Sequence, residues 1–246
     1  MKLAEKLVTV TTQYGEMPAF SVRPDTSDAC PPVILYMDAG GYREELCNFA
    51  RRIAEQGYFC ILPDLYYRVG MLRFDLSRRT EATAAVVRAA MAGLKDADIA
   101  EDTGSIIAWL DGHAHAASGP IGCIGYCMSG RYVVIAAARY PERIAAAASL
   151  YGVGLVREDA ESPHLSLGDV KAELYFGFAE NDPLVPPNVV PTLRSSLERH
   201  KVPHLIEVFP GTKHGFCFPE DPRYTGVAAE QAWGRVFALW KRALSE

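Results

Sequence analysis

Hydrophobic and polar positions alternate at the start of the chain and then give way to continuous apolar runs. The stretch "KLVTVTTQYGEMPAFSV" alternates on both sides of Tyr14 and Gly15, which predicts a β-hairpin over residues 7–23. The runs "PPVILYMDAGG" and "YFCILPDLYY" are typical of strands that are buried on both faces. Four later runs predict further strands: "GPIGCIGY", "RIAAAASLYG", "AELYFGFA" and "HLIEVFPG".

Between these runs the apolar positions repeat with a helical period. In "ELCNFARRIAEQG" they fall at Leu46, Phe49 and Ile53, and the pattern ends at Gly57. Further helices are expected over 80–111, with an interruption near "KDADIAEDTG", and over 128–139, 184–201 and 225–246. The polar stretches 95–103 and 157–170 are expected to be surface loops.

Strands that alternate with helices predict an α/β fold. We expect three layers, with a mostly parallel central sheet covered by helices on both faces, in a single domain spanning 1–246. The region 66–100 is expected to form a lid or to line a pocket. In such sheets the functional residues lie in loops beyond the carboxyl ends of the strands, which narrows the search for a site.

Composition excludes several partner classes. The chain has 246 residues and a formal net charge of −5 without a basic block, so neither nucleic acid nor an anionic membrane is expected as a partner. The start of the chain lacks the apolar core of a signal peptide, and no apolar run approaches the length of a membrane span. Six scattered cysteines are typical of reduced thiols. We therefore expect a cytoplasmic protein, either a monomer or a homodimer.

Three expected strand ends carry reactive side chains. They are followed by "GYCMSG", "ENDPLVP" and "TKHGF", which supply Cys127, Asp182 and His214 in chain order. A thiol at a glycine-flanked turn before a helix can act as a nucleophile, because the helix N-terminus favours the thiolate. The histidine can then carry the proton, and the aspartate can orient the imidazole. This is the nucleophile–acid–histidine order of the α/β-hydrolase fold.

An oxyanion that develops on a substrate would need two backbone N–H donors. One is expected at Met128, directly after the nucleophile, and the other in the loop after the first buried strand, at Ala39.

Each of these residues also has a simpler interpretation. Cys127 could be a buried structural thiol, a disulfide partner of Cys123 or a metal ligand, and His214 could be an ordinary loop residue. Asp182 could cap the following helix. The pair His113 and His115 resembles a metal pair without a third ligand nearby, so no metal is expected.

Six segments in this order resemble the dienelactone hydrolase family: "PVILYMDAGG", "FCILPDLYYR", "GPIGCIGYCMSG", "FAENDPLVP", "PGTKHGF" and "YTGVAAEQAW". The resemblance spans nearly the whole chain. It implies a triad of Cys127, Asp182 and His214 that hydrolyses an enol-lactone or related ester through an acyl-thioester. It also implies that an acid at Asp38 hydrogen-bonds the resting thiol, although the family usually has glutamate there.

Further departures from the family pattern concern the elbow and the substrate. Ser129 stands where the family has glycine. The family's well-known lactonase carries, four residues after the histidine, an arginine that binds the substrate carboxylate, whereas this chain has Phe218. Candidates for the lactonase's second arginine lie at Arg73, Arg78, Arg79 and Arg88, and Tyr126 either shapes the pocket or packs beneath it.

The sequence thus predicts a cysteine hydrolase of lactones or small esters that needs no metal or organic cofactor. One alternative is a carboxylesterase or thioesterase acting on a less anionic substrate, which Phe218 would suit. Another, from a different class, is a non-catalytic ligand-binding protein with a redox-sensitive thiol at Cys127.

Overall fold

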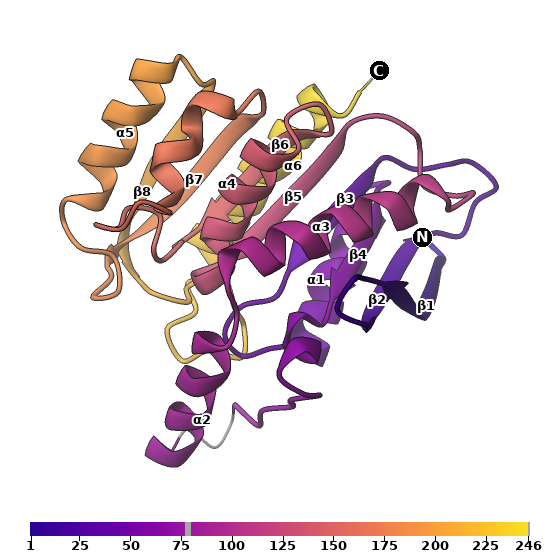
Figure 1. Cartoon of the computed structure of the whole chain (residues 1–246), viewed down its shortest axis with the longest axis horizontal. Coiled ribbons are helices and arrows are strands. Elements are labelled where there is room, and N and C mark those ends of the chain that lie inside the picture. The colour runs from indigo at the N-terminus through magenta and orange to yellow at the C-terminus, as the bar shows by residue number, and fades with distance from the viewer. Residues whose placement is uncertain (77–79, 246) are drawn as a thin grey trace. The chain divides into compact units, whose positions relative to one another are not determined.

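The computed structural model describes residues 1–76 and 80–245 of the chain. Its contacts divide into two compact units, Met1–Gly119 and Pro120–Glu246, which are described separately below. The α-helices and β-strands of both units are labelled in Figure 1. That the chain forms a single domain over 1–246 stays a prediction.

Four strands of the N-terminal unit neighbour one another in the order β1-β2-β4-β3. β1 and β2 form the expected hairpin, in which Leu7 lies opposite Phe20. β2 also pairs antiparallel with β4, whereas β3 and β4 are parallel. Every residue of β3 and β4 is buried, as the continuous apolar runs predicted. Their bounds are Leu3–Thr11 (β1), Glu16–Pro24 (β2), Pro32–Tyr36 (β3) and Phe59–Pro63 (β4).

The helices of this unit are α1 (Glu44–Glu55), the 3₁₀ helix η1 (Leu65–Arg68), α2 (Glu81–Ala92) and α3 (Asp96–Asp111). The expectation of a surface loop over 95–103 is wrong, because α3 begins at Asp96. Asp96 and Asp98 favour the N-terminal turn of a helix through its dipole, and Ile99 is buried. The helical interruption lies just before them, at 93–95.

The C-terminal unit contains β5 (Ile121–Tyr126), β6 (Ile144–Leu150), β7 (Glu173–Asn181) and β8 (His204–Lys213), which neighbour one another in this order. All three pairings are parallel. The carboxyl ends of the four strands therefore share one edge of the sheet, where a site is expected in an α/β fold.

Five helices complete this unit: η2 (Cys127–Ser129), α4 (Gly130–Arg139), η3 (Pro163–Asp169), α5 (Val189–His200) and α6 (Gly226–Ala243). Figure 1 shows α4 and α6 on opposite faces of the β5–β8 strands. The stretch 157–170 is not entirely loop, since it contains η3. α5 begins later than the expected residue 184, because Pro186 and Pro187 disfavour helical conformation in the residues before them.

No helix in the described ranges is long and apolar enough to cross a membrane.

Candidate active site

The three residues of the expected triad all lie in the C-terminal unit, each directly after a strand. Cys127 follows the last residue of β5, Asp182 follows β7 and His214 follows β8. These strands are parallel, so the three side chains start from the same edge of the sheet.

Cys127 occupies a strained turn between β5 and α4. Its φ is +54°, a left-handed conformation that non-glycine residues seldom adopt and that is often found at functional sites. The turn is so tight that a Cβ at residue 125 would lie 2.2 Å from the carbonyl oxygen of Ser129, so only Gly125 fits. Cys127 is partly exposed, whereas the other five cysteines are buried, and none of the six forms a disulfide.

Ser129 closes this turn from inside. Its Oγ accepts a hydrogen bond from the Tyr126 N–H at 2.9 Å and donates one to the Tyr126 carbonyl at 3.0 Å. The side chain is fully buried. The serine hydroxyl therefore provides a hydrogen-bond partner for both polar backbone groups of Tyr126, which a glycine at this position cannot do.

His214 and Asp182 form a buried hydrogen-bonded pair. His214 Nδ1 donates to Asp182 Oδ2 at 2.7 Å, and the two side chains are 8% and 2% exposed. The other carboxylate oxygen accepts from the Leu184 N–H at 3.0 Å. Asp182 thus orders its own turn and also holds the imidazole, so the two interpretations of this residue are compatible.

The other ring nitrogen of His214, Nε2, has no such partner. Nε2 is buried and makes no hydrogen bond of ordinary geometry with any described residue. Burial alone lowers the pKa of His214, but the hydrogen bond to Asp182 and the neighbouring Cys127 outweigh it and raise the pKa to about 9. At neutral pH the imidazole can therefore carry a proton beside the sulfur.

Aromatic rings support this arrangement from the core. Tyr126 and Phe218 are both buried, with ring centroids 5.2 Å apart. Tyr151, at a φ of +39°, places its ring edge-on to the His214 imidazole at 5.0 Å. Burial favours packing for Tyr126 and Phe218, and substrate contact by either stays a prediction.

The sequence did not single out Tyr151, Asp221 or Arg223. Asp221 is buried, and its carboxylate accepts from Arg223 Nε at 2.8 Å and Nη2 at 2.6 Å, which fixes the loop after His214. Tyr151 directly follows β6, so its place at a strand end was the signal that could have found it. Asp221 and Arg223 carry no comparable pattern.

In the N-terminal unit, the loop 37–43 contains Asp38 and Ala39. The Asp38 carboxylate accepts from Arg43 Nη1 at 2.5 Å and Nη2 at 3.2 Å, and from the Gly40 N–H at 3.1 Å. Asp38 therefore orders its own loop, and regulation of the thiol by Asp38 stays a prediction.

Of the arginines predicted to bind substrate, two form ion pairs with carboxylates and two lie outside the described residues. Arg73 Nη1 donates to the buried Asp64 at 2.7 Å, and its guanidinium lies 4.7 Å from the centre of the Tyr42 ring. Arg88 pairs with Glu81 on the exposed surface of α2. Arg78 and Arg79 fall outside the described residues.

The remaining cysteine and histidine candidates have structural surroundings. Cys123 is fully buried on β5, and burial raises the pKa of its thiol. His113 lies beside His115 and contacts the aromatic rings of Trp109 and Phe59. Within the described ranges, no group of three His, Cys, Asp or Glu side chains could hold a metal ion.

The family model of the dienelactone hydrolases matches residues 17–244. The chain belongs to the dienelactone hydrolase family. It is therefore a member of a family of hydrolases.

Relatives with named activities agree with this assignment. A protein of Synechocystis sp. named "Putative carboxymethylenebutenolidase" is 27% identical over 97% of this chain and 96% of its own length. A protein of the same name from Escherichia coli K12 is 27% identical over 95% of this chain and 85% of its own length.

Solved structures show the same fold. A dienelactone hydrolase homologue from Klebsiella pneumoniae matches with a TM-score of 0.87 at 23% identity, covering 98% of this chain and 100% of its own. A dienelactone hydrolase-like phosphotriesterase from metagenomic libraries matches with a TM-score of 0.83 at 18% identity, covering 100% of both chains. The predicted α/β-hydrolase fold is thus confirmed.

Proposed function

We propose that the chain is a cysteine-dependent hydrolase of lactones or small carboxylic esters. The observation that carries the proposal is the left-handed Cys127 at the end of β5, in the same unit as the His214–Asp182 pair. A buried imidazole with one nitrogen held by a carboxylate and the other open is suited to carrying a proton during acyl transfer.

The reaction would proceed in two steps. The Cys127 thiolate attacks the acyl carbon, and the bond to the ester oxygen breaks as His214 gives its proton to that oxygen. In a lactone the released oxygen stays on the same molecule. Water then attacks the thioester, His214 takes a proton from the water, and the thiolate leaves to yield the carboxylic acid. The amides of Met128 and Ala39 would stabilise the oxyanion of each tetrahedral intermediate.

Lactones are favoured as the substrate class by the names of the relatives. Besides the carboxymethylenebutenolidases, a Bradyrhizobium protein that is 22% identical over 97% of this chain and 95% of its own length is named "Probable 2-oxo-3-(5-oxofuran-2-ylidene)propanoate lactonase". We further propose a small-molecule substrate, cytoplasmic localisation and a monomer or homodimer, without nucleic-acid or membrane partners.

A carboxylesterase or thioesterase acting on a less anionic substrate is the second candidate. Phe218 favours it, because a buried apolar ring stands where the family's lactonase has a substrate-binding arginine. The loss of a bidentate arginine–carboxylate contact removes a strong, charge-assisted interaction with an anionic substrate.

The test compares hydrolysis of p-nitrophenyl acetate and of cis-dienelactone by the native chain and two cysteine variants. Cys127→Ala should lower kcat on any active substrate by at least about a thousandfold, because the nucleophile is lost. Cys123→Ala is the matched control, since it removes a thiol from β5, the strand that directly precedes Cys127, and it should keep most of the turnover.

The outcomes separate the hypotheses. Turnover of the simple ester without the lactone would favour the second candidate. A native chain that hydrolyses neither ester, with Cys127 inert to iodoacetamide, would contradict both hydrolase proposals. Retained turnover in Cys127→Ala would remove this residue from the mechanism.

A further inference from the structure

The loop 37–43 of the N-terminal unit holds the peptide groups around Ala39 in fixed orientations. The Asp38 carbonyl accepts from the Gly41 N–H at 3.0 Å. The next peptide group is held at both ends, because the Ala39 carbonyl accepts from Tyr66 Oη at 2.9 Å and the Gly40 N–H donates to Asp38 Oδ1 at 3.1 Å. The Ala39 N–H itself bonds to no acceptor in the described part of the chain.

Tyr66 is the only one of these partners that comes from a different element. It lies on η1, which follows β4, and its side chain is fully buried. Its ring also packs against the loop, since a Cβ at Gly41 would lie 3.0 Å from it. Gly41 has a φ of +72°, so both the backbone and the space at this position require glycine.

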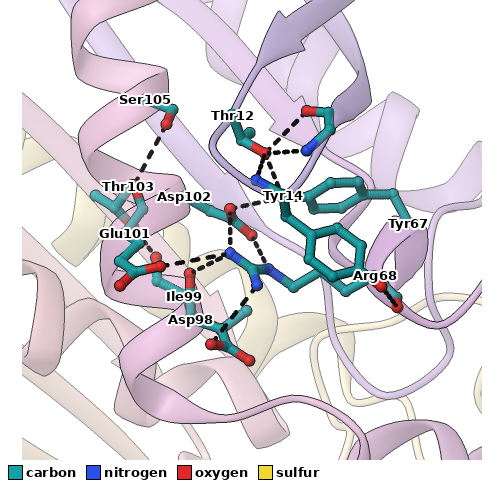
Figure 2. Close-up of polar contacts among 11 residues, drawn as sticks. Thr12, Tyr14, Tyr67, Arg68, Asp98, Ile99, Glu101, Asp102, Thr103 and Ser105 are labelled. Carbon is teal, nitrogen blue, oxygen red and sulfur yellow. Dashed lines mark hydrogen bonds and ion pairs between the residues drawn. The ribbon is translucent and has the colours of Figure 1, made fainter.

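The helix η1 is itself held at both ends. The carboxylate of Asp64 accepts from the Tyr66 N–H at 3.3 Å at its start. At its end, the Arg68 guanidinium bonds to Asp102 of α3 through Nε at 2.9 Å and Nη2 at 2.8 Å. Figure 2 shows this guanidinium among Asp98, Glu101 and Asp102, with Tyr14 beside it. The backbone of η1 that carries Tyr66 is therefore held in place at both ends.

We propose that Tyr66 is a positioning residue for the oxyanion hole, acting by holding the Ala39 carbonyl so that the neighbouring Ala39 N–H stays free to donate. The proposal rests on the proposed function, in which Ala39 supplies one oxyanion donor. Donors that are oriented in advance stabilise a developing oxyanion without reorganisation. Without the Tyr66 hydroxyl, the Ala39 carbonyl loses a partner, and the Ala39–Gly40 peptide can rotate and disturb the preceding peptide group, which carries the Ala39 N–H.

Tyr66→Phe tests the inference, because it removes only the hydroxyl. We expect kcat for p-nitrophenyl acetate to fall roughly tenfold to a hundredfold, below the effect of deleting an oxyanion donor outright, while KM changes little. Alkylation of Cys127 by iodoacetamide should keep its native rate, because attack on a saturated carbon forms no oxyanion. Tyr67→Phe is the matched control: it removes a neighbouring hydroxyl of η1 that bonds to Asp102, and it should keep the native kcat.

Activity is counted per folded molecule, with the folded fraction of each variant measured by circular dichroism. If Tyr66→Phe does not fold, Gly41→Ala is the second variant, because its Cβ would push against the Tyr66 ring; it should show the same loss of kcat with unchanged alkylation. Native kcat in Tyr66→Phe, or equal losses in kcat and alkylation, would overturn the positioning role. Failure of the proposed function is recognised separately, as absence of esterase activity in the native chain.

Discussion

In each unit carboxylates are buried against nitrogen-bearing side chains, and one such pair from each unit has nearly the same geometry. In the N-terminal unit Arg68 Nη2 lies 2.8 Å from Asp102, with side chains 8% and 1% exposed. In the C-terminal unit His214 Nδ1 lies 2.7 Å from Asp182, with side chains 8% and 2% exposed. Distance and burial therefore do not distinguish a structural pair from the pair that we propose to be catalytic.

The two pairs differ in the partners of the remaining nitrogens of Arg68 and His214. Arg68 also uses Nε on Asp102, and Asp98 and Glu101 lie within 4 Å of its guanidinium. His214 leaves Nε2 without a hydrogen bond within the described residues, next to Cys127. A buried polar network that is fully satisfied stabilises the fold, whereas one that is left open at a single atom is available for chemistry.

Asp182→Asn should have the largest effect. The amide cannot hold the imidazole in its working orientation and protonation state, so kcat should fall by about 10⁴-fold, as in other triads. Steady-state kinetics on the preferred ester measures this. Asp159→Asn, which alters an exposed carboxylate of the same unit, is the control and should leave kcat unchanged. An Asp182→Asn enzyme within tenfold of native would contradict a triad.

Asp102→Ala should mainly reduce stability. It leaves a buried guanidinium without its main partner, so the free energy of unfolding should fall by about 3 kcal/mol, the lower end for such changes because Asp98 and Glu101 remain. Urea unfolding measures this loss. Glu81→Gln, in the exposed pair with Arg88, should cost less than about 1 kcal/mol.

The distinction between the two pairs would be wrong if Asp102→Ala lowered kcat strongly and left the free energy of unfolding unchanged. In the folded enzyme, well below its melting temperature, the loss of kcat should stay smaller than in Tyr66→Phe.

The residues of the proposed catalytic pair are easier to single out from the sequence than those of the structural pair, for a physical reason. Asp182 and His214 stand directly after buried strands, whose apolar runs are visible in the sequence. Asp102 lies inside a helix whose start the sequence missed, because a polar first turn looks like a loop until its buried face is seen. The pairing of Arg68 with Asp102 depends on how η1 lies on α3, which no local pattern encodes.

Two further contacts described above could not be predicted from the sequence either. The role of Ser129 depends on a turn tight enough for its hydroxyl to reach the backbone of Tyr126. The bond from Tyr66 to Ala39 joins residues that are close only after β3 and β4 have paired. The strands were predicted from the apolar runs of the sequence, whereas these contacts depend on backbone geometry.

Stability should depend on pH through His214. Its pKa is raised to about 9 in the folded chain, above the ordinary value of 6.5, so folding favours the protonated form. The resulting stabilisation is complete below about pH 6.5, shrinks as the pH rises and is lost above about pH 9. Urea unfolding between these limits should show a decline in the native chain and a flatter profile in Asp182→Asn. Identical slopes would mean that Asp182 does not raise this pKa.

Ser129→Ala should have the smallest effect. The Tyr126 N–H loses a buried acceptor, which costs about 1–2 kcal/mol of stability. Thermal melting detects this change, and Ser105→Ala, at a half-buried position of α3, is the control. A melting temperature equal to that of the control would show that the turn is held by its other contacts.

The left-handed backbone of Cys127 is enforced by its neighbours and not by the cysteine itself. Gly125 lies against Ser129, and a Cβ at Gly130 would lie 2.3 Å from the Cα of Gly152. The turn would therefore keep its shape if the side chain at 127 were exchanged. During evolution a single substitution at residue 127 could therefore replace the reactive sulfur with oxygen at the same place. Moving the site elsewhere would require several glycines to change together.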